Sequence, residues 1–488
     1  MNAALKKTFY RLSESSPLRV NYKACRSAQY TTGDPHDMAQ VHPFQAFRYN
    51  PQRVPFERVL TQPYDKISPP MQDRYYAADP HNLIAVEKGR TFPDDSPQNN
   101  VYTRAAAAIE NWIRENIVTQ DPVPSFYAYT QEYTVPGTGE QRTRRGFIGA
   151  GKLEDYSAGV VFRHEHTLSG PKADRLELLR HTRMHTGQLF MLYSDPQLRI
   201  DAIVKDAESA APATTLHDEY GVVHRLRVIA DPDRTAAIKS AMEEQKLVIA
   251  DGHHRYETAL TYRKERRLTA GGVHPSAPYA QAPYDFAMMT FVNTCSEGLT
   301  ILPTHRLAAN LHDFSWSEAR RYLEPWFEAQ AFPFTDDGQK AEAQSKFLAQ
   351  LHQARGQRAI GVYPTAEHAK RAYFVLTLRR GADLTQLLHS VSPLQRELDV
   401  VLLHDGILEP AFGITLQSVT AERNLSYERE ASAALDAVDR GAAQIAFLLN
   451  PVDVDQVMRI ATSGEVMPQK STDFYPKLLS GIAMYRVD

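Results

Sequence analysis

The spacing of apolar side chains predicts helices and strands that alternate along most of this chain. Ala106, Ile109, Trp112 and Ile113 recur at the spacing of one helix face, which predicts a helix at residues 105–118. By the same criteria we expect further helices at residues 174–186, 316–330, 339–354, 393–408, 430–440 and 453–463. We expect strands at residues 126–130, 143–153, 160–166, 189–193, 222–229, 286–293, 359–363, 371–378 and 444–449. Residues 41–90 are expected to form turns with short strands. This mixture of elements predicts an α/β (α+β) fold.

The most informative segment is residues 247–260, where an apolar run meets charged and imidazole side chains. Its first four residues are typical of a buried strand, and Asp251-Gly252 interrupts them before a helix expected to reach about residue 268. Two histidines and an arginine stand at the helix start, where unpaired N–H groups and the helix dipole attract anions. The expected phosphate-binding residues are Gly252, His253 and Arg255, and the expected catalytic residues are Asp251 and His254.

A strand, a turn and a helix also meet in many α/β folds that bind no ligand. Asp251 would then be the N-cap of the helix, and Glu257 would pair with a nearby arginine. The composition of the segment favours the anion site, because a packed junction needs neither two adjacent histidines nor an arginine beside them.

Two further segments carry candidate residues. In Gln-Pro-Tyr-Asp-Lys at residues 62–66, Asp65 suits a base or a Mg²⁺ ligand for phosphoryl transfer. The alternative is an ordinary turn aspartate that bonds its own backbone. His305 and Arg306 are expected at the end of a strand, where they either contact phosphate or form a buried turn.

His164, Glu165 and His166 form a third candidate cluster. On a strand, the two histidines share one face and Glu165 points to the other. Same-face histidines suit zinc, which needs at least three protein ligands, but contact with substrate or a purely structural role are alternatives. Lys172 and Arg175 follow shortly and suit an anion better than a dication.

Lys470, Ser471 and Thr472 resemble the end of a phosphate-binding loop but lack its glycines. Together with Lys477, they either hold an anion or form a solvated tail anchored by the neighbouring aromatic residues. We expect this segment to close the site over the 251–255 motif.

Residues 251–260, Asp-Gly-His-His-Arg-Tyr-Glu-Thr-Ala-Leu, resemble the signature of a widespread prokaryotic family of unknown function. Other segments similar to that family are Pro43-Phe44 with Arg48, residues 62–68, residues 164–167 with Lys172, Asp174 and Arg175, residues 302–306, and residues 467–477. The resemblance therefore extends from about residue 42 to the end of the chain.

Gly252, His254 and Arg255 are also similar to the G-x-H-R-x-x-A box of the ParB/sulfiredoxin superfamily, which holds nucleotide phosphates at a helix start. Its members include CTP-binding segregation proteins, ATP-dependent sulfiredoxins and an ADP-dependent kinase of free serine. Ala259 falls one position later than the alanine of the box, whereas Asp251 matches an acidic residue of the kinase-like members. Neither cysteine adjoins the box, which argues against sulfinic-acid chemistry.

This resemblance implies a ParB/sulfiredoxin-like nucleotide-binding core with insertions, ADP or ATP as the nucleotide, and Mg²⁺. The length of 488 residues is too great for one core. We expect a disordered or extraneous extension at residues 1–40, the motif domain at 41–308, and a C-terminal α/β domain at 309–488. Met38 is an alternative start.

Composition narrows the classes of function. The net charge of −3 gives no electrostatic reason to expect nucleic acid, and no apolar run is long enough to span a bilayer. Two cysteines exclude a disulfide framework and suit a reducing compartment, so we expect the cytoplasm. An organelle is the alternative if the basic, serine-containing residues 1–37 are a transit peptide.

Three functions fit these observations. The first is a nucleotide-dependent phosphotransferase that acts on a small hydroxyl compound such as free serine. The second is a metal-dependent hydrolase built on His164, His166, His253 and His254. The third is a non-catalytic protein that binds nucleotide or nucleic acid.

Overall fold

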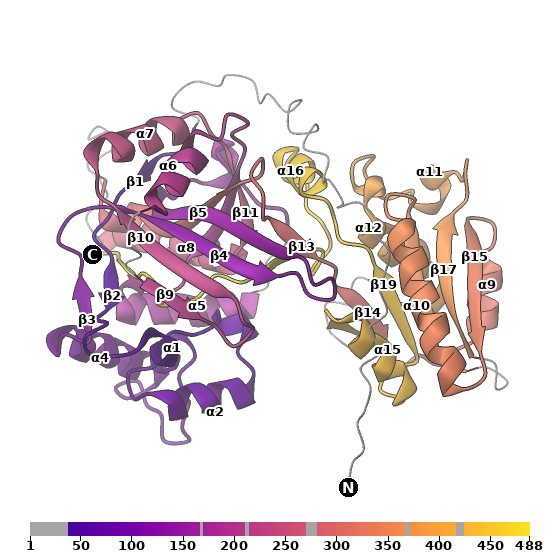
Figure 1. Ribbon diagram of the computed structural model, residues 1–488. Coiled ribbons are helices and arrows are strands. Elements are labelled where there is room, and N and C mark those ends of the chain that lie inside the picture. The colour runs from indigo at the N-terminus through magenta and orange to yellow at the C-terminus, as the bar shows by residue number, and fades with distance from the viewer. Residues whose placement is uncertain (1–37, 166–168, 210–213, 270–280, 367–370, 416–423) are drawn as a thin grey trace, which may run out of the picture.

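The computed structural model describes residues 38–165, 169–209, 214–269, 281–366, 371–415 and 424–488, and it is a mixed α/β fold built on two large sheets (Figure 1). Residues 1–37 of the extension expected at 1–40, and His166, lie outside the described residues. Ala39 is buried, and its backbone N–H donates to the Gln245 carbonyl at 2.9 Å. None of the described helices is long and apolar enough to cross a membrane.

The first sheet has nine strands. In spatial order they are β6 (Val161–Phe162), β11 (Leu247–Asp251), β8 (Leu189–Tyr193), β12 (Phe286–Asn293), β5 (Gln141–Lys152), β4 (Phe126–Thr134), β10 (Val223–Ile229) and β9 (Thr214–His217), with β1 (Val41–His42) paired to β5. The β6–β11 and β8–β12 pairs are parallel and the other pairs are antiparallel.

Helices cover both faces of this sheet. The helices of this part of the chain are α1 (Phe56–Val59), α2 (Pro69–Ala78), α3 (Ile84–Glu87), α4 (Val101–Arg114), α5 (Ser169–Thr182), α6 (Arg199–Ala207), α7 (Pro232–Met242) and α8 (His253–Thr269). In β11, Val248 belongs to the buried cluster that includes α4 and α5, whereas Ile249 belongs to the cluster that includes α6 and α7. Burial on both faces explains why the first four residues of β11 are all apolar.

The second sheet is antiparallel and has the order β15 (Phe327–Phe334), β17 (Arg371–Leu378), β16 (Ala359–Pro364), β19 (Ile445–Leu449), β14 (His305–Ala308) and β18 (Leu425–Glu428). Its helices are α9 (Trp316–Leu323), α10 (Asp337–Gln353), α11 (Leu384–Leu387), α12 (Asp399–Leu403), α13 (Glu409–Phe412), α15 (Ala431–Asp439) and α16 (Val454–Thr462). One buried apolar cluster continues from the first sheet into the second.

The end of the chain returns to the first sheet, where Figure 1 places the C-terminus. Strand β20 (Asp473–Tyr475) pairs with β13 (Thr300–Leu302), and β21 (Tyr485–Arg486) pairs with β7 (Met184–His185). The division of the chain at about residue 308 stays a prediction. Strand β14, which precedes that division, nevertheless pairs with β18 and β19 of the second sheet. The last residues pair with strands of the first half of the chain.

Several sequence predictions were wrong in their boundaries. The helix expected at 316–330 ends at Leu323, because Pro325 follows and cannot continue it, and the aromatic segment after it forms β15. The helix expected at 105–118 begins at Val101, where the Asn100 side chain accepts hydrogen bonds from the first turn. Residues 41–90 contain short helices as well as strands.

Two other errors concern candidate residues. The strand expected at 160–166 ends at Phe162, so His164 does not lie on a strand. His305 and Arg306 begin β14 rather than end a strand.

The helix expected at 393–408 is not continuous. It is divided into a 3₁₀ turn, α12 and a π-helical turn at His404–Leu408.

Candidate functional site

The junction between β11 and α8 has the predicted order of strand, glycine and helix. Gly252 has φ of 96°, a conformation that side chains other than hydrogen disfavour. A Cβ atom there would lie 3.0 Å from Leu189 Cδ2 and 3.2 Å from Arg255 Nη2. Glycine is therefore needed for the backbone to turn directly into α8, whose first-turn N–H groups have no acceptor within the helix.

Asp251, the last residue of β11, is held by cations rather than by the helix start. Lys477 Nζ lies 2.8 Å from Asp251 Oδ2 and 2.9 Å from Asp473 Oδ1, while Arg255 Nη2 lies 3.9 Å from Asp251 Oδ1. Burial opposes ionisation of Asp251, but Lys477 and Arg255 outweigh it and hold its pKa far below the usual range. Burial likewise opposes the charge of Lys477, but Asp251 and Asp473 raise its pKa. Both groups therefore stay charged at neutral pH.

The proline turn at residues 62–66 lies beside this ion pair. Tyr64–Lys66 forms a 3₁₀ turn, and the Lys88 ammonium fixes it by donating to the Ile67 carbonyl at 2.5 Å. Burial and the charge of Lys477 lower the pKa of Lys66 to about 8. The Asp65 carboxylate lies 3.9 Å from Lys66 Nζ and is 37% exposed.

Two arginines complete the charged surface. Arg255 donates to the carbonyl of Gln188, and its side chain is 17% exposed. Arg175 stacks on Tyr64 with 4.4 Å between its guanidinium carbon and the ring centroid, and it donates to the Glu87 carbonyl at 2.8 Å. We define the junction site as Tyr64–Lys66, Arg175, Asp251–Arg255, Asp473 and Lys477.

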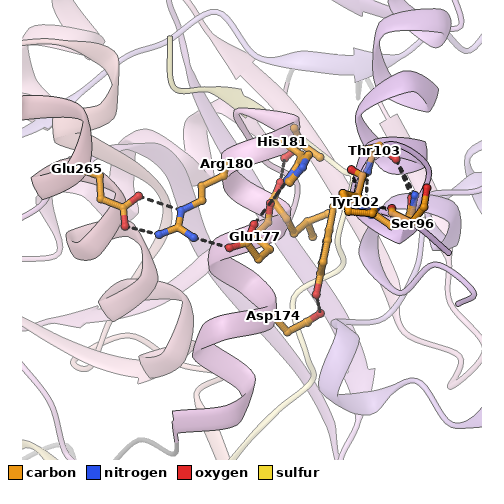
Figure 2. A network of polar contacts seen from close by, with 12 residues as sticks. Ser96, Tyr102, Thr103, Asp174, Glu177, Arg180, His181 and Glu265 are labelled. Atoms are coloured by element: carbon orange, nitrogen blue, oxygen red, sulfur yellow. Dashed lines mark hydrogen bonds and ion pairs between the residues drawn. The ribbon is translucent and has the colours of Figure 1, made fainter. Parts of the chain in front are cut away.

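Neighbouring helices fix the position of α5, which carries Arg175. Figure 2 shows α5 bonded on one side to α4, through Tyr102 and Asp174 at 3.0 Å, and on the other to α8, through Arg180 and Glu265. The Asp174 carboxylate also accepts from Arg175 at 2.6 Å. Arg175 is therefore held in place by contacts outside the junction site.

A pocket opens beside the two arginines. Arg175 and Arg255 both line it, together with aliphatic side chains of α5, β7 and β8. The pocket extends the junction site from a charged surface into a partly apolar space.

His164 and His253 connect the junction to the C-terminal loop. His164 Nδ1 lies 2.7 Å from the Ile249 carbonyl and Nε2 lies 2.9 Å from Thr472 Oγ1, so Nδ1 donates and Nε2 accepts. Burial lowers the pKa of His164 to about 4, which keeps the ring neutral. His253 Nε2 accepts from the His164 backbone N–H at 3.4 Å. The two imidazole rings pack edge to face, with 4.7 Å between their centroids. His164 has no ring nitrogen left for a metal.

Loop 468–472 uses its polar groups to hold its own shape. The Lys470 backbone N–H donates to Glu165 Oε1 at 3.0 Å, and the Ser471 hydroxyl donates to the Pro468 carbonyl. The Lys470 side chain is exposed. Burial raises the pKa of Glu165. Of the three residues expected to bind phosphate here, the cation of Lys470 is therefore the one presented to solvent.

The remaining candidates lie around this loop and on α8. Arg306 is fully buried and donates to the Lys470 carbonyl at 3.1 Å, and His305 Nδ1 accepts from the Leu449 N–H at 3.2 Å. Lys172 pairs with Glu257 at 2.9 Å, which links α5 to α8. His254 is half-buried, and burial lowers its pKa.

The residues that could hold a metal ion do not form a ready site. Across the described ranges, no three His, Cys, Asp or Glu side chains are grouped to hold one. Asp251 is already paired with Lys477, and the cations around it oppose a further cation. The cations around Asp251 therefore disfavour Mg²⁺ at that carboxylate.

The structure adds residues that the sequence analysis did not select. Lys66, Asp473 and Glu87 were not among the candidates, and Lys477 was considered only with its loop. Lys66 could have been selected from the sequence, because it directly follows the candidate residue Asp65. Nothing in the local sequence indicates that Glu87 lies beside Arg175 and Arg255.

Comparison with known proteins gives a family and several solved structures. Residues 41–401 match the model of a family described as "Protein of unknown function (DUF1015)". A search among curated proteins gave no match.

Three solved structures resemble the chain at low sequence identity. A conserved hypothetical protein from Pyrococcus furiosus is 13% identical, with a TM-score of 0.29, over 64% of this chain and 87% of that one. A free serine kinase in complex with ADP is 12% identical, with a TM-score of 0.31, over 67% of this chain and 89% of that one. C-terminally truncated SbnI from Staphylococcus aureus is 9% identical, with a TM-score of 0.31, over 68% of this chain and 85% of that one.

Proposed function

The chain belongs to the DUF1015 family, whose function is unknown, and we propose that it transfers a phosphoryl group from a nucleotide to a small hydroxyl compound. The donor would be ADP or ATP, and free serine is the first acceptor to test. The match of Gly252, His254 and Arg255 to the ParB/sulfiredoxin box is consistent with this proposal. The expected cytoplasmic location belongs to the same proposal.

One observation carries the proposal, namely the convergence of cations from distant segments at one helix start. Lys66, Arg175, Arg255 and Lys477 come from four parts of the chain, and each lies at the junction site. Folding would not gather like charges unless something offset their repulsion. Asp251 and Asp473 pair with Lys477, and Asp174 pairs with Arg175. The positive charge left for a polyanionic ligand is then mainly that of Lys66 and Arg255.

The residues suggest a division of roles. Arg175, Arg255 and Lys66 would bind phosphate oxygens, as prepositioned cations stabilise charge on a transferring group. Lys477 is committed to Asp251 and Asp473 and would hold these carboxylates in place.

Asp65 is the most exposed of these carboxylates and would accept the proton of the acceptor hydroxyl. The hydroxyl oxygen forms a bond to the terminal phosphorus, the bond from phosphorus to the bridging oxygen breaks, and the shortened nucleotide leaves with that electron pair.

Calorimetry with ADP, ATP, CTP, GTP and pyrophosphate tests the binding step. Arg255→Ala should weaken binding about 10- to 100-fold, the loss expected for one charged hydrogen bond. Arg255→Lys should recover part of that loss because it keeps the charge. Arg234→Ala removes an exposed arginine of α7 outside the junction site, and its affinity should equal that of wild type.

The possible results separate the proposal from its alternatives. Unchanged affinity in Arg255→Ala would remove the phosphate role of the helix start. Failure of every nucleotide and of pyrophosphate to bind would refute the proposed function. Binding without transfer to serine or other hydroxyl compounds would instead favour a non-catalytic nucleotide-binding protein.

A further inference from the structure

The pocket beside Arg175 and Arg255 is too apolar to serve only phosphates. Its walls include Leu178 and Leu179 of α5, Met184 of β7 and Leu189 of β8. Phosphate oxygens gain nothing from aliphatic side chains, whereas a flat heterocycle buries its faces against them. The two arginines at one wall and the aliphatic residues at the others suit a ligand with an anionic end and an apolar body.

Glu87 supplies a hydrogen-bond acceptor in this pocket. It is 2% exposed, and its carboxyl oxygens accept from Thr186 Oγ1 at 2.8 Å and Ser480 Oγ at 3.1 Å. The described residues give this carboxyl group no ion-pair partner. Two carboxylate oxygens have about four acceptor positions, so Glu87 keeps capacity for another donor. Gly187 leaves room beside it, since a Cβ there would lie 3.5 Å from Glu87 Oε1 and 3.0 Å from Arg255 Nη1.

His185 supplies a hydrogen-bond donor in the same pocket. Its Nδ1 accepts from the Met288 backbone N–H at 3.3 Å, and burial with the charge of Arg255 lowers its pKa to about 4. The neutral ring therefore carries its proton on Nε2. Glu87 and His185 thus line one pocket with opposite hydrogen-bonding character.

We propose that this pocket binds the base of the nucleotide and selects adenine, with the exocyclic amino group donating to Glu87 and a ring nitrogen accepting from His185 Nε2. The inference rests on the proposed function, because Arg175 and Arg255 would hold the phosphates at the pocket mouth. Hypoxanthine and guanine present a carbonyl where adenine has its amino group and an N–H where adenine has an acceptor. Both contacts would then be mismatched, which leaves buried polar groups unpaired.

A comparison of ADP with inosine diphosphate tests this selection, because the two differ mainly in the amino group. Wild-type protein should bind ADP at least about tenfold more tightly, the cost of one unpaired buried group. Glu87→Gln should bring the two affinities together without changing pyrophosphate binding. The control Glu110→Gln alters an exposed glutamate of α4 and should keep the wild-type ratio.

A second variant tests the pocket without touching its polar groups. Leu179→Phe adds volume to an aliphatic wall of the pocket. It should weaken the binding of ADP about tenfold or more, while the affinity for pyrophosphate stays unchanged. If Glu87→Gln fails to fold, the affinities of Leu179→Phe for ADP and pyrophosphate still test whether the base lies in this pocket.

The alternative outcomes are distinguishable. Equal affinities for ADP and inosine diphosphate in wild-type protein, or pyrophosphate that binds as tightly as ADP, would overturn the base pocket while the proposed function stands. Cytidine diphosphate bound as tightly as ADP would overturn the selection of adenine, because cytosine has the same amino and acceptor pattern. If neither pyrophosphate nor any nucleotide binds, the proposed function itself is refuted.

Discussion

Lys66 shows how one residue acquires its properties from chain segments far away. Its side chain is 23% exposed, Asp65 lies 3.9 Å from its ammonium, and Lys477 repels it. Burial and this repulsion lower its pKa to about 8, so its charge changes in the range where many enzymes are assayed.

We predict that anion affinity falls as the pH rises through 8. A bound anion favours the ammonium form and raises the pKa of Lys66, so the complex binds more protons than the free protein, and affinity is lost as those protons leave. Pyrophosphate should bind about tenfold more weakly at pH 9 than at pH 7, following the protonated fraction. Isothermal calorimetry across this range measures the change.

Lys66→Arg is the matched control because arginine stays protonated throughout. The titration of pyrophosphate itself affects both proteins equally, so the difference between their profiles isolates Lys66. Parallel profiles for the two proteins would show that Lys66 does not contact the anion.

At the scale of elements, the C-terminal segment completes the junction site. Arg144 of β5 donates to the Tyr475 carbonyl at 3.2 Å, and Gln131 of β4 donates to the Lys477 carbonyl at 2.8 Å. These bonds fix the backbone from which Lys477 reaches Asp251 and Asp473. The first sheet therefore positions a cation that lies more than two hundred residues beyond Asp251 in the chain.

We predict that Lys477→Met destabilises the protein by about 3 kcal/mol, because it removes the cation shared by two mostly buried carboxylates. Asp251 then keeps only the more distant Arg255, and Asp473 keeps Arg429. Denaturant unfolding measures the loss. Lys346→Met removes the exposed partner of Glu342 on α10 and should change stability by less than about 0.5 kcal/mol. A similarly small effect of Lys477→Met would mean that water solvates the two carboxylates.

At the scale of the whole molecule, buried histidines connect stability to pH. Burial lowers the pKa of His164, His185 and His305 to about 4 and that of His404 to about 3. His164 follows β6, His185 lies on β7, His305 lies on β14 and His404 lies in the π-helical turn. Their protonation therefore opposes folding in several separate parts of the molecule.

We predict that stability falls as the pH drops from about 6.5 toward 4. In that window the unfolded chain binds protons at these histidines and the folded chain does not, so lowering the pH favours unfolding. Denaturant midpoints at pH 7, 6 and 5 should decrease in that order. His404→Gln should flatten the decline, whereas His352→Gln, at an exposed position of α10, should leave it unchanged. A midpoint independent of pH would contradict this account.

Local patterns predicted much of the fold and part of the site. The apolar run at 247–250, the Asp251-Gly252 break and the helix after it were all predicted, because side-chain periodicity and glycine conformation act within a few residues. The errors came from signals of the same range that were overlooked, such as Pro325 after α9. The boundaries of β6 were missed because tertiary packing sets where a short strand ends.

The sequence by itself determined the element types, the mixed α/β class and the glycine-led helix start with its charged residues. Only the tertiary structure decided that Asp65, Lys66, Arg175 and Lys477 meet at that helix start, and that Glu87 lies in the adjoining pocket. The physical reason is range: backbone conformation depends on neighbours in the chain, whereas charge, pKa and binding geometry depend on neighbours in space.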